Sequence, residues 1–224
     1  MKIMLNVVLL AALSSAALSG CAGLMPAGAG FGAGRVSGHE SSKQPVSVEH
    51  LVYRIDGHRY ITINGNDNCE GSVVYYDRQL GIRKPVAYSG FSLGYGVAEG
   101  RYAIDSTYIA IPVLGWSDYR GGSMSIYYSN DQGRTFHKIY YGGEPRAEAK
   151  ISVKGNDLYV YGNRFGASKF DISHNVPTDE FGQLIDRFGN FVDPTTMPQD
   201  IQSPSGIERM SCGAPIARPP PAHN

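Results

Sequence analysis

The side chains best able to do chemistry in this 224-residue chain are its cysteines and histidines. The three cysteines, Cys21, Cys69 and Cys212, form no C-x-x-C pair. The six histidines are scattered, with no two at metal-ligand spacing, and the chain contains no H-E-x-x-H or G-x-S-x-G motif. We therefore predict no catalytic residue, no metal ion and no cofactor.

A sialidase-type reaction would need an arginine cluster, an acid and a Tyr–Glu pair. Arg54, Arg101, Arg120 and Arg134 are spread along the chain, and no motif groups them. Surface charges and cross-strand pairs explain such arginines without any site. The sequence therefore favours a binding protein over an enzyme.

Cys21 ends the most specific motif of the chain. Lys2 and an apolar run over residues 3–18, too short for a good membrane span, precede the letters LSGC at 18–21. This arrangement resembles the lipobox of bacterial lipoproteins, which implies cleavage before Cys21 and stable anchoring through several acyl chains. Ala22 after the cysteine implies the outer membrane, facing the periplasm. An ordinary secretory peptide with an incidental cysteine is the alternative.

The other two cysteines, Cys69 and Cys212, form an even pair. In an oxidising periplasm such a pair predicts a disulfide. The bridge would close a loop of about 140 residues, for which loop entropy gives an upper figure of ~5 kcal/mol. The alternative, a reactive thiol, lacks a neighbouring histidine or basic residue in the sequence.

Charge and composition exclude one class of partner and favour one class of fold. Lys plus Arg and Asp plus Glu number 20 each, so the net charge is zero and nucleic-acid binding is not expected. Counts of 28 Gly, 13 Pro and 15 Tyr indicate a turn-rich β protein. The predicted organisation is a signal peptide (1–20), a lipidated and flexible linker (21–45), a β-rich domain (46–213) and a loose tail (214–224).

Apolar and β-branched runs separated by Gly, Asn and Asp turns predict the elements of this domain. Residues 48–64 predict a hairpin with a two-residue type I′ turn at Asp56-Gly57, and residues 148–161 predict another. The other predictions are strands at 72–76, 82–88, 104–113 and 169–172, a loop at 115–123 and a short helix at 179–188. The expected fold is all-β, with antiparallel hairpins forming a sandwich or a small propeller-like domain.

One turn, SNDQGRTF at 129–136, has a recognisable pattern. Asp131 can accept hydrogen bonds from the backbone of its own loop, and Gly133 permits a positive φ. The residues that match the pattern are Ser129, Asp131, Gly133, Thr135 and Phe136. They resemble the Asp-box of sialidases and many β-propellers, which stabilises a hairpin and binds no substrate itself.

The candidate partner-binding residues surround the single tryptophan. They are Trp116, Asp118, Tyr119 and Arg120. Trp, Tyr and Arg are the types that dominate binding hot spots. The alternative is that Trp116 packs into the core and its neighbours are solvated. Adjacent tyrosine pairs, such as Tyr75 and Tyr76, should place one ring inward and one outward along a strand.

Several of these pieces occur in an order that resembles a known family. The lipobox and spacer are followed by YRIDGHRYITI, a polar loop with Cys69, VVYYD, the Asp-box, and PSGIERMSC ending at Cys212. The order is similar to that of the periplasmic lipoprotein immunity proteins that neutralise phospholipase effectors of the type VI secretion system. The resemblance covers about residues 51–212.

The resemblance implies inhibition by binding to a cognate phospholipase effector, with membrane attachment through the N-terminal lipid. The inhibitor would cover the active-site entrance of the effector or block its membrane-docking surface. Two alternatives remain: a glycan-binding or sialidase-like envelope lipoprotein, and an envelope scaffolding lipoprotein.

Overall fold

The computed structural model describes residues 47–89, 101–117, 121–142, 149–163, 166–186 and 188–213, all within the unit Lys43–Asn224. The predicted signal peptide and linker, the lipidation site Cys21 and the tail at 214–224 lie outside the described residues. Within the described ranges, no helix has the length and apolar character needed to cross a bilayer.

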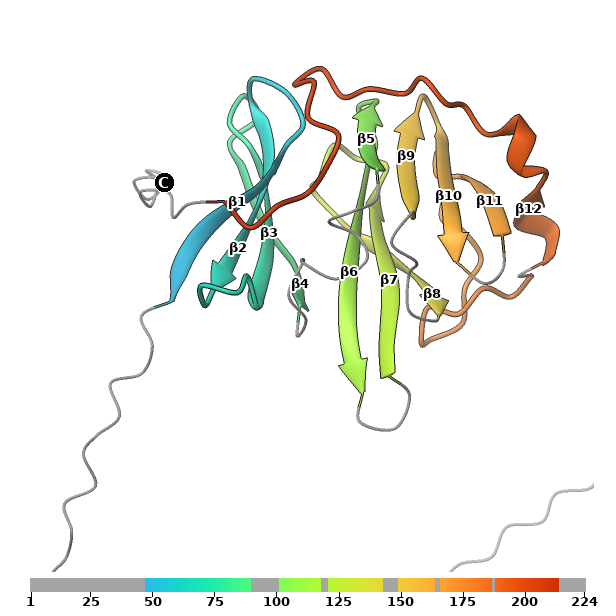
Figure 1. Cartoon of the computed structure of the whole chain (residues 1–224), viewed down its shortest axis with the longest axis horizontal. Helices are drawn as coiled ribbons and strands as arrows, with labels where there is room; N and C mark the ends of the chain where they lie inside the picture. The colour runs from blue at the N-terminus through green and yellow to red at the C-terminus, as the bar shows by residue number, and fades with distance from the viewer. Residues whose placement is uncertain are drawn as a thin grey trace, which may run out of the picture. The chain divides into compact units, whose positions relative to one another are not determined.

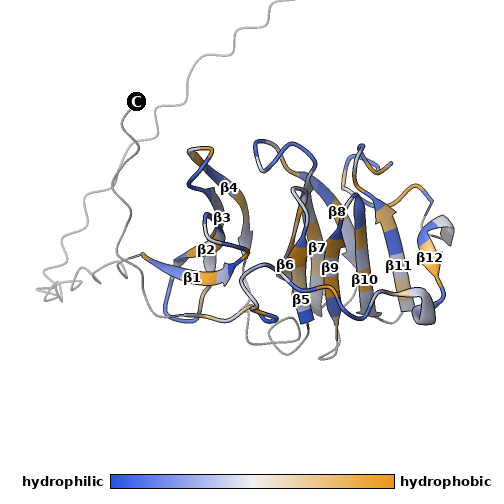
Figure 2. Ribbon diagram, turned by 90° about the horizontal axis from the view of Figure 1, so that it is seen from above, coloured by the Kyte–Doolittle hydropathy of each residue, from blue (hydrophilic) through white to orange (hydrophobic). Residues whose placement is uncertain are grey.

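Three sheets form an all-β, sandwich-like fold, which confirms the predicted fold class (Figures 1 and 2). The first sheet has the order β1 (Val48–Arg54), β2 (Arg59–Gly65), β3 (Gly71–Asp77) and β4 (Ile82–Ser89). The second has the order β6 (Ile109–Ser117), β7 (Gly121–Ser129) and β8 (His137–Gly142). The third has the order β12 (Phe191–Val192), β11 (Gly166–Asp171), β10 (Asp157–Asn163), β9 (Lys150–Lys154) and β5 (Arg101–Asp105). Two 3-10 helices, η1 (Phe188–Asn190) and η2 (Pro194–Thr196), flank β12.

Side chains from all three sheets meet in one hydrophobic core. In β2, Ile61 and Ile63 are 1% exposed and alternate with residues of the opposite face, as the two-residue period of a strand requires. Tyr53 and Tyr102 pack edge to face at 4.5 Å in the core. Among the described residues, the strand pairs are antiparallel except β5 and β9, which pair in parallel, so hairpins alone do not account for the topology.

The first hairpin forms, but the predicted type I′ turn is wrong. Residues 55–58 connect β1 to β2, and Gly57 is not among the glycines with positive φ, which a type I′ turn requires. The backbone N–H groups of Ile55 and Asp56 both donate to the carbonyl of Arg59. The Asp56 side chain closes the turn by accepting from the N–H groups of His58 and Arg59.

The predicted strand at 104–113 is two strands in the structure. β5 ends at Asp105 and β6 begins at Ile109, because Ser106 turns the chain between them. Its hydroxyl accepts from the N–H of Tyr108 and donates to the carbonyl of Gly155. Pro112 lies within β6, and β6 is an edge strand of its sheet, where a residue without an N–H is tolerated. Much of the predicted loop at 115–123 instead continues β6 and β7.

The predicted helix at 179–188 is absent from the described residues of that segment. Gly182 has φ +81°, which interrupts a right-handed helix. Tyr140 of β8 donates its N–H to the carbonyl of Gly182 at 2.6 Å, and Asp179 accepts from the N–H groups of Phe181 and Gln183. The segment therefore lines the edge of β8.

Residues 201–213, called here the C-terminal strap, cross from the third sheet back to the first (Figure 1). The strap bonds the edge strand β5 through Tyr102 N–H to the Glu208 carbonyl at 2.8 Å. Its own N–H groups donate to the carbonyls of Leu51 and Val52 in the edge strand β1, and to the carbonyl of Ile55 directly after that strand. Two sheet edges that would otherwise be open are thus covered by one segment.

The hydroxyl of Tyr53 links the strap to β1 and β5. The N–H of Ile104 donates to Ser203 Oγ at 2.7 Å, and Ser203 Oγ lies 2.7 Å from the Tyr53 hydroxyl. The Tyr53 hydroxyl in turn lies 2.6 Å from the carbonyl of Ile207 and 3.0 Å from that of Tyr102. A tyrosine hydroxyl has one proton, so it donates to one of these carbonyls and accepts from Ser203.

We expect Tyr53→Phe to lower the free energy of unfolding by about 1–3 kcal/mol, because buried polar groups lose their partner. Urea unfolding measures the change. Tyr159→Phe is the matched control, since that hydroxyl bonds Asp157 in a half-buried position on β10. Equal losses in the two variants would contradict the assigned role of the Tyr53 hydroxyl.

Candidate functional site

A group of charged and polar side chains surrounds the turn between β1 and β2. His58 Nδ1 lies 2.9 Å from Asp77 Oδ1, and His58 Nε2 lies 3.6 Å from Asp56 Oδ1. Arg59 Nε donates to Asp56 Oδ2 at 2.6 Å, and its Nη1 donates to the carbonyl of Ser106. Acids, an arginine and a histidine thus converge beside a surface cleft, which is the arrangement that acid–base chemistry would need.

The carboxylates of this cluster are already engaged by backbone groups. Asp77 Oδ1 accepts from the N–H groups of Gln79 and Leu80, and Asp56 closes its own turn. Burial acts to raise the pKa of Asp56, but hydrogen bonds from Arg59 and His58 outweigh it, and the pKa lies below its ordinary value. A carboxylate held in this way is a poor proton carrier at neutral pH. The cluster is best explained as a network that fixes two turns.

The turn at 129–136 is also held by its own side chains. Ser129 Oγ accepts from the N–H of Gly133 at 2.7 Å and donates to Asp131 Oδ1 at 2.8 Å. Asp131 accepts from the N–H of Thr135 at 2.9 Å and from its hydroxyl at 2.6 Å. Gly133 has φ +89°, and Phe136 packs against the core. These polar contacts are internal to the turn, so its geometry stabilises the hairpin.

The pKa of Asp131 lies below its ordinary value. Partial burial acts to raise it, but hydrogen bonds from Thr135, Ser129 and Arg134 outweigh that effect. A carboxyl whose pKa is lower in the folded state contributes stability above its unfolded pKa of about 4 and loses it as the pH falls through the folded pKa.

We therefore expect Asp131→Asn to reduce the loss of stability that the wild type suffers between pH 7 and pH 3. Urea unfolding midpoints at the two pH values measure this. The control is Asp200→Asn, which changes an exposed aspartate. An unchanged pH dependence in Asp131→Asn, relative to the wild type, would count against the role of this carboxylate.

The face of the first sheet that points away from the main core carries a smaller cluster. Tyr60 and Tyr76 are cross-strand neighbours whose rings stack at 4.8 Å with an interplanar angle of 6°. Glu49, 5% exposed, accepts from the hydroxyls of Thr62 and Tyr76 at 2.7 and 2.6 Å. Burial, with the hydrogen bond to Glu49, raises the pKa of Tyr76 to about 12. This aromatic layer is rigid because ring stacking and hydrogen bonds hold it together.

Two arginines cover the aromatic layer. The Arg78 guanidinium lies 5.0 Å from the centre of the Tyr60 ring, and that of Arg83 lies 5.6 Å from the Tyr76 ring. Arg83 also donates from Nε to the Tyr76 hydroxyl at 2.8 Å. These contacts restrain the two long side chains while leaving both residues exposed. Such preorganised cations suit a partner with acidic groups.

The edge strand β4 extends this surface. Tyr88 of β4 pairs with Ser72 of β3, and Arg83 pairs with Tyr76, so Tyr88 and Arg83 lie on the same face of the sheet. Tyr88 is 68% exposed. We call the exposed residues of this surface the β3–β4 face. Its members are Arg78, Arg83, Pro85 and Tyr88. It combines exposed Arg and Tyr over a packed aromatic layer, the residue types enriched in binding hot spots.

The tryptophan patch predicted from the sequence is only partly described. Trp116 lies on β6, where its backbone pairs with Gly122 of β7, rather than in a loop. Asp118, Tyr119 and Arg120 lie outside the described residues. The end of β4 is close to β6, because Ser89 Oγ donates to the Leu114 carbonyl at 3.5 Å. The described part of the patch therefore lies on a strand next to β4, and this contact is made from the core side of β4.

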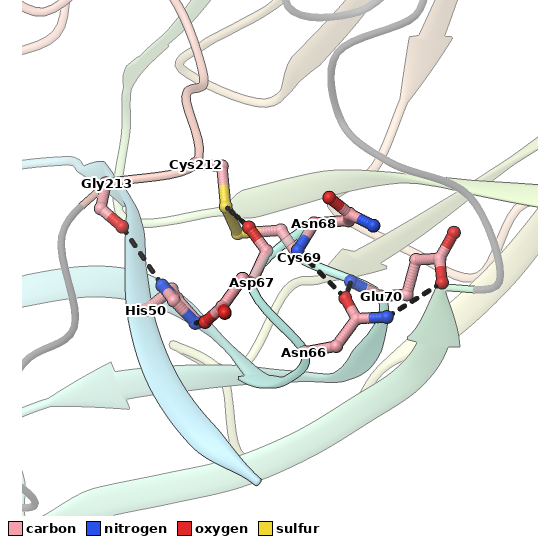
Figure 3. Close-up of a disulfide and its surroundings, with 8 residues drawn as sticks. All are labelled: His50, Asn66, Asp67, Asn68, Cys69, Glu70, Cys212 and Gly213. Carbon is pink, nitrogen blue, oxygen red and sulfur yellow. Dashed lines mark hydrogen bonds and ion pairs between the residues drawn. A yellow bond between two sulfur atoms is a disulfide. The ribbon is translucent and has the colours of Figure 1, made fainter. Parts of the chain in front are cut away.

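The predicted disulfide is confirmed. Cys69, in the loop between β2 and β3, is joined to Cys212 of the C-terminal strap across a separation of 143 residues (Figure 3). Asn66 shapes that loop, since its side-chain oxygen accepts from the N–H groups of Asn68 and Glu70. The bridge thus fixes the end of the strap beside β1.

Sequence reasoning missed the β3–β4 face. Alternation within RYIT and VVYY could have assigned Tyr60 and Tyr76 to the face opposite Ile61 and Tyr75. The positions of Arg78 and Arg83 over those rings depend on the register between β3 and β4, which the sequence does not specify.

The turns are fixed by their own side chains, and an arginine–tyrosine surface is exposed on a rigid sheet. These features define a β-rich interaction module. A profile described as the T6SS Tli3 immunity protein matches residues 46–165, more than half of the chain, so the chain belongs to this family of type VI secretion immunity proteins. Membership implies that it binds a cognate effector protein. No curated protein matches the chain.

Proposed function

We propose that this protein is a lipid-anchored periplasmic immunity protein that inhibits a phospholipase effector of the type VI secretion system by binding it. The family match is the observation that carries the proposal. The LSGC motif ending at Cys21 supports lipid anchoring at the outer membrane. The Cys69–Cys212 disulfide suits an oxidising compartment.

The inhibitor would act at the membrane that the effector attacks. Anchoring through Cys21 confines it to the same surface as the phospholipid substrate, which raises its effective concentration. Binding alone then suffices, either by covering the active-site entrance or by blocking the membrane-docking surface of the effector. No group of this chain needs to take part in a reaction.

We assign effector contact to the β3–β4 face together with the neighbouring end of β6 and β7. Arg78 and Arg83 offer cations whose positions are already restrained, so little side-chain entropy is lost on binding. Tyr88 offers an exposed aromatic ring on an edge strand. Trp116 lies on the adjacent strand β6.

Co-production with the cognate phospholipase effector tests the function. Cells should survive when the mature protein reaches the periplasm, and Cys21→Ser should weaken protection while leaving binding between the purified proteins intact. Continued killing with the mature protein present in the periplasm would refute the proposal.

We expect Tyr88→Ala to weaken effector binding about 10- to 30-fold, the loss typical of a hot-spot aromatic residue. Calorimetry with the purified effector measures the dissociation constant. Phe181→Ala is the matched control, because Phe181 is 66% exposed but lies in the segment beside β8. Equal effector affinity of the wild type and Tyr88→Ala would contradict the assignment of the β3–β4 face to the interface.

A further inference from the structure

A histidine with an unused ring nitrogen lies against the disulfide. His50 is 3% exposed on β1, and its Nδ1 lies 3.0 Å from the carbonyl of Gly213. A carbonyl can only accept, so Nδ1 carries a proton and donates it. In the neutral ring, Nε2 is then left with a free lone pair. Nε2 is buried and has no hydrogen-bond partner, which is costly for a polar atom.

The surroundings of this nitrogen contain three other donors that metal ions prefer. Ligand atoms of His50, Cys69 and Cys212 lie within 4.8 Å of one another. Asp67 Oδ1 lies 3.9 Å from His50 Nε2, and its carboxylate is beside the ring in Figure 3. Two sulfurs and one imidazole make a three-donor set, and the exposed Asp67 carboxylate beside the ring would supply the fourth donor of a tetrahedral Zn²⁺ site.

The hydrogen bond from His50 to Gly213 matches the support that metal-binding histidines require. A ligating imidazole commonly donates its second N–H to a carbonyl or carboxylate, which fixes its tautomer and orientation. Gly213 follows Cys212 directly, so the same segment supplies one donor atom and the orienting carbonyl. Asp67 likewise precedes Cys69 by two residues in one short loop.

We propose that His50, Cys69, Cys212 and Asp67 form a latent site for a thiophilic divalent cation such as Zn²⁺, available only when the disulfide is reduced. A dithiol reductant transfers two electrons and two protons to the disulfide, giving two thiols, and is itself oxidised to a disulfide. Zn²⁺ then binds both sulfurs as thiolates and displaces their two protons. The metal replaces the covalent bridge between the strap and the loop after β2, so disulfide and metal exclude each other.

Titration of the full mature chain against a chromophoric zinc chelator tests the site. The chain is reduced with a dithiol, freed of reductant without oxygen, and titrated beside the oxidised chain. We expect one Zn²⁺ per reduced chain and none in the oxidised chain. With Co²⁺ as the probe, thiolate charge-transfer bands and tetrahedral d–d bands should appear only after reduction.

Variants separate this site from simple chelation by two thiols. His50→Gln should weaken Zn²⁺ binding by the reduced chain by about 100-fold, and Asp67→Ala by about tenfold, in line with losses of metal-site groups. His174→Gln is the control, because it changes an exposed histidine of another segment and should alter nothing. Equal zinc affinity in the reduced wild type and His50→Gln would overturn the proposal. Failure of the reduced wild type to bind one equivalent, whether folded or not, would also overturn it.

Discussion

Gly133→Ala should destabilise the protein by about 3–5 kcal/mol, because it combines a clash with backbone strain. A Cβ at this position would fall within the ring of Tyr75, a fully buried core residue. The backbone at Gly133 has φ +89°, which side chains resist. The variant should therefore melt about 6–20 °C below the wild type, measured by circular dichroism.

Gly155→Ala is the matched control for that variant. Gly155 also lies in a hairpin turn with positive φ, +57°, but a Cβ there would meet nothing within 4 Å. Its cost should be limited to backbone strain, about 1 kcal/mol. A second test introduces Gly133→Ala into the Tyr75→Leu variant, where the smaller side chain relieves the clash. The loss of unfolding free energy caused by Gly133→Ala should be smaller there than in the wild type. Similar losses at Gly133 and Gly155 would show that contact with Tyr75 is unimportant.

Replacement of both Cys69 and Cys212 by serine should lower the free energy of unfolding by about 2–5 kcal/mol. The bridge closes a long loop, because the paired cysteines have a sequence separation of 143, so its removal frees many conformations of the unfolded chain. It also releases the strap from the loop after β2. Thermal melting in oxidising buffer should fall by about 4–20 °C relative to the wild type.

The reduced wild type provides the control for the double variant. In the presence of excess dithiol and a metal chelator, it should melt near the temperature of the serine variant. The serine variant itself should not respond to dithiol. Unchanged melting of the variant in oxidising buffer would contradict a stabilising role for the bridge.

The local features of this fold could be predicted from the sequence, because each is fixed by nearby residues. The hairpin around Gly155-Asn156 follows from turn chemistry between two alternating runs. The Cys69–Cys212 bridge follows from an even cysteine pair. Of the paired tyrosines, Tyr75 enters the main core and Tyr76 the opposite face, as alternation requires.

Long-range pairing could not be predicted in the same way. The parallel register of β5 with β9 joins segments separated by the whole second sheet, and no local signal specifies it. The break between β5 and β6 was not predicted because only three polar residues, Asp105, Ser106 and Thr107, interrupt the apolar run there. The missed turn depends on a hydrogen bond from Ser106 to Gly155, far along the chain.

The candidate binding surface was predictable only in residue type. Tyrosine and arginine were expected at the interface, but the sequence drew attention to Trp116 because it is the single tryptophan. The β3–β4 face depends on cross-strand register, which brings Arg83 over Tyr76 and places Tyr88 on the same side.

The C-terminal strap also determines when this protein can finish folding. The last described residues form hydrogen bonds with the edge of β1, the first strand of the domain, so these contacts span almost the whole described sequence. The native state therefore forms only after almost the whole chain has been synthesised. A chain that is synthesised from its amino terminus has β1 with an unpaired edge until Ser211 and Gly213 are made. Polypeptides cut short before residue 201 would keep that edge open and leave Cys69 without its partner, which would make them prone to aggregation.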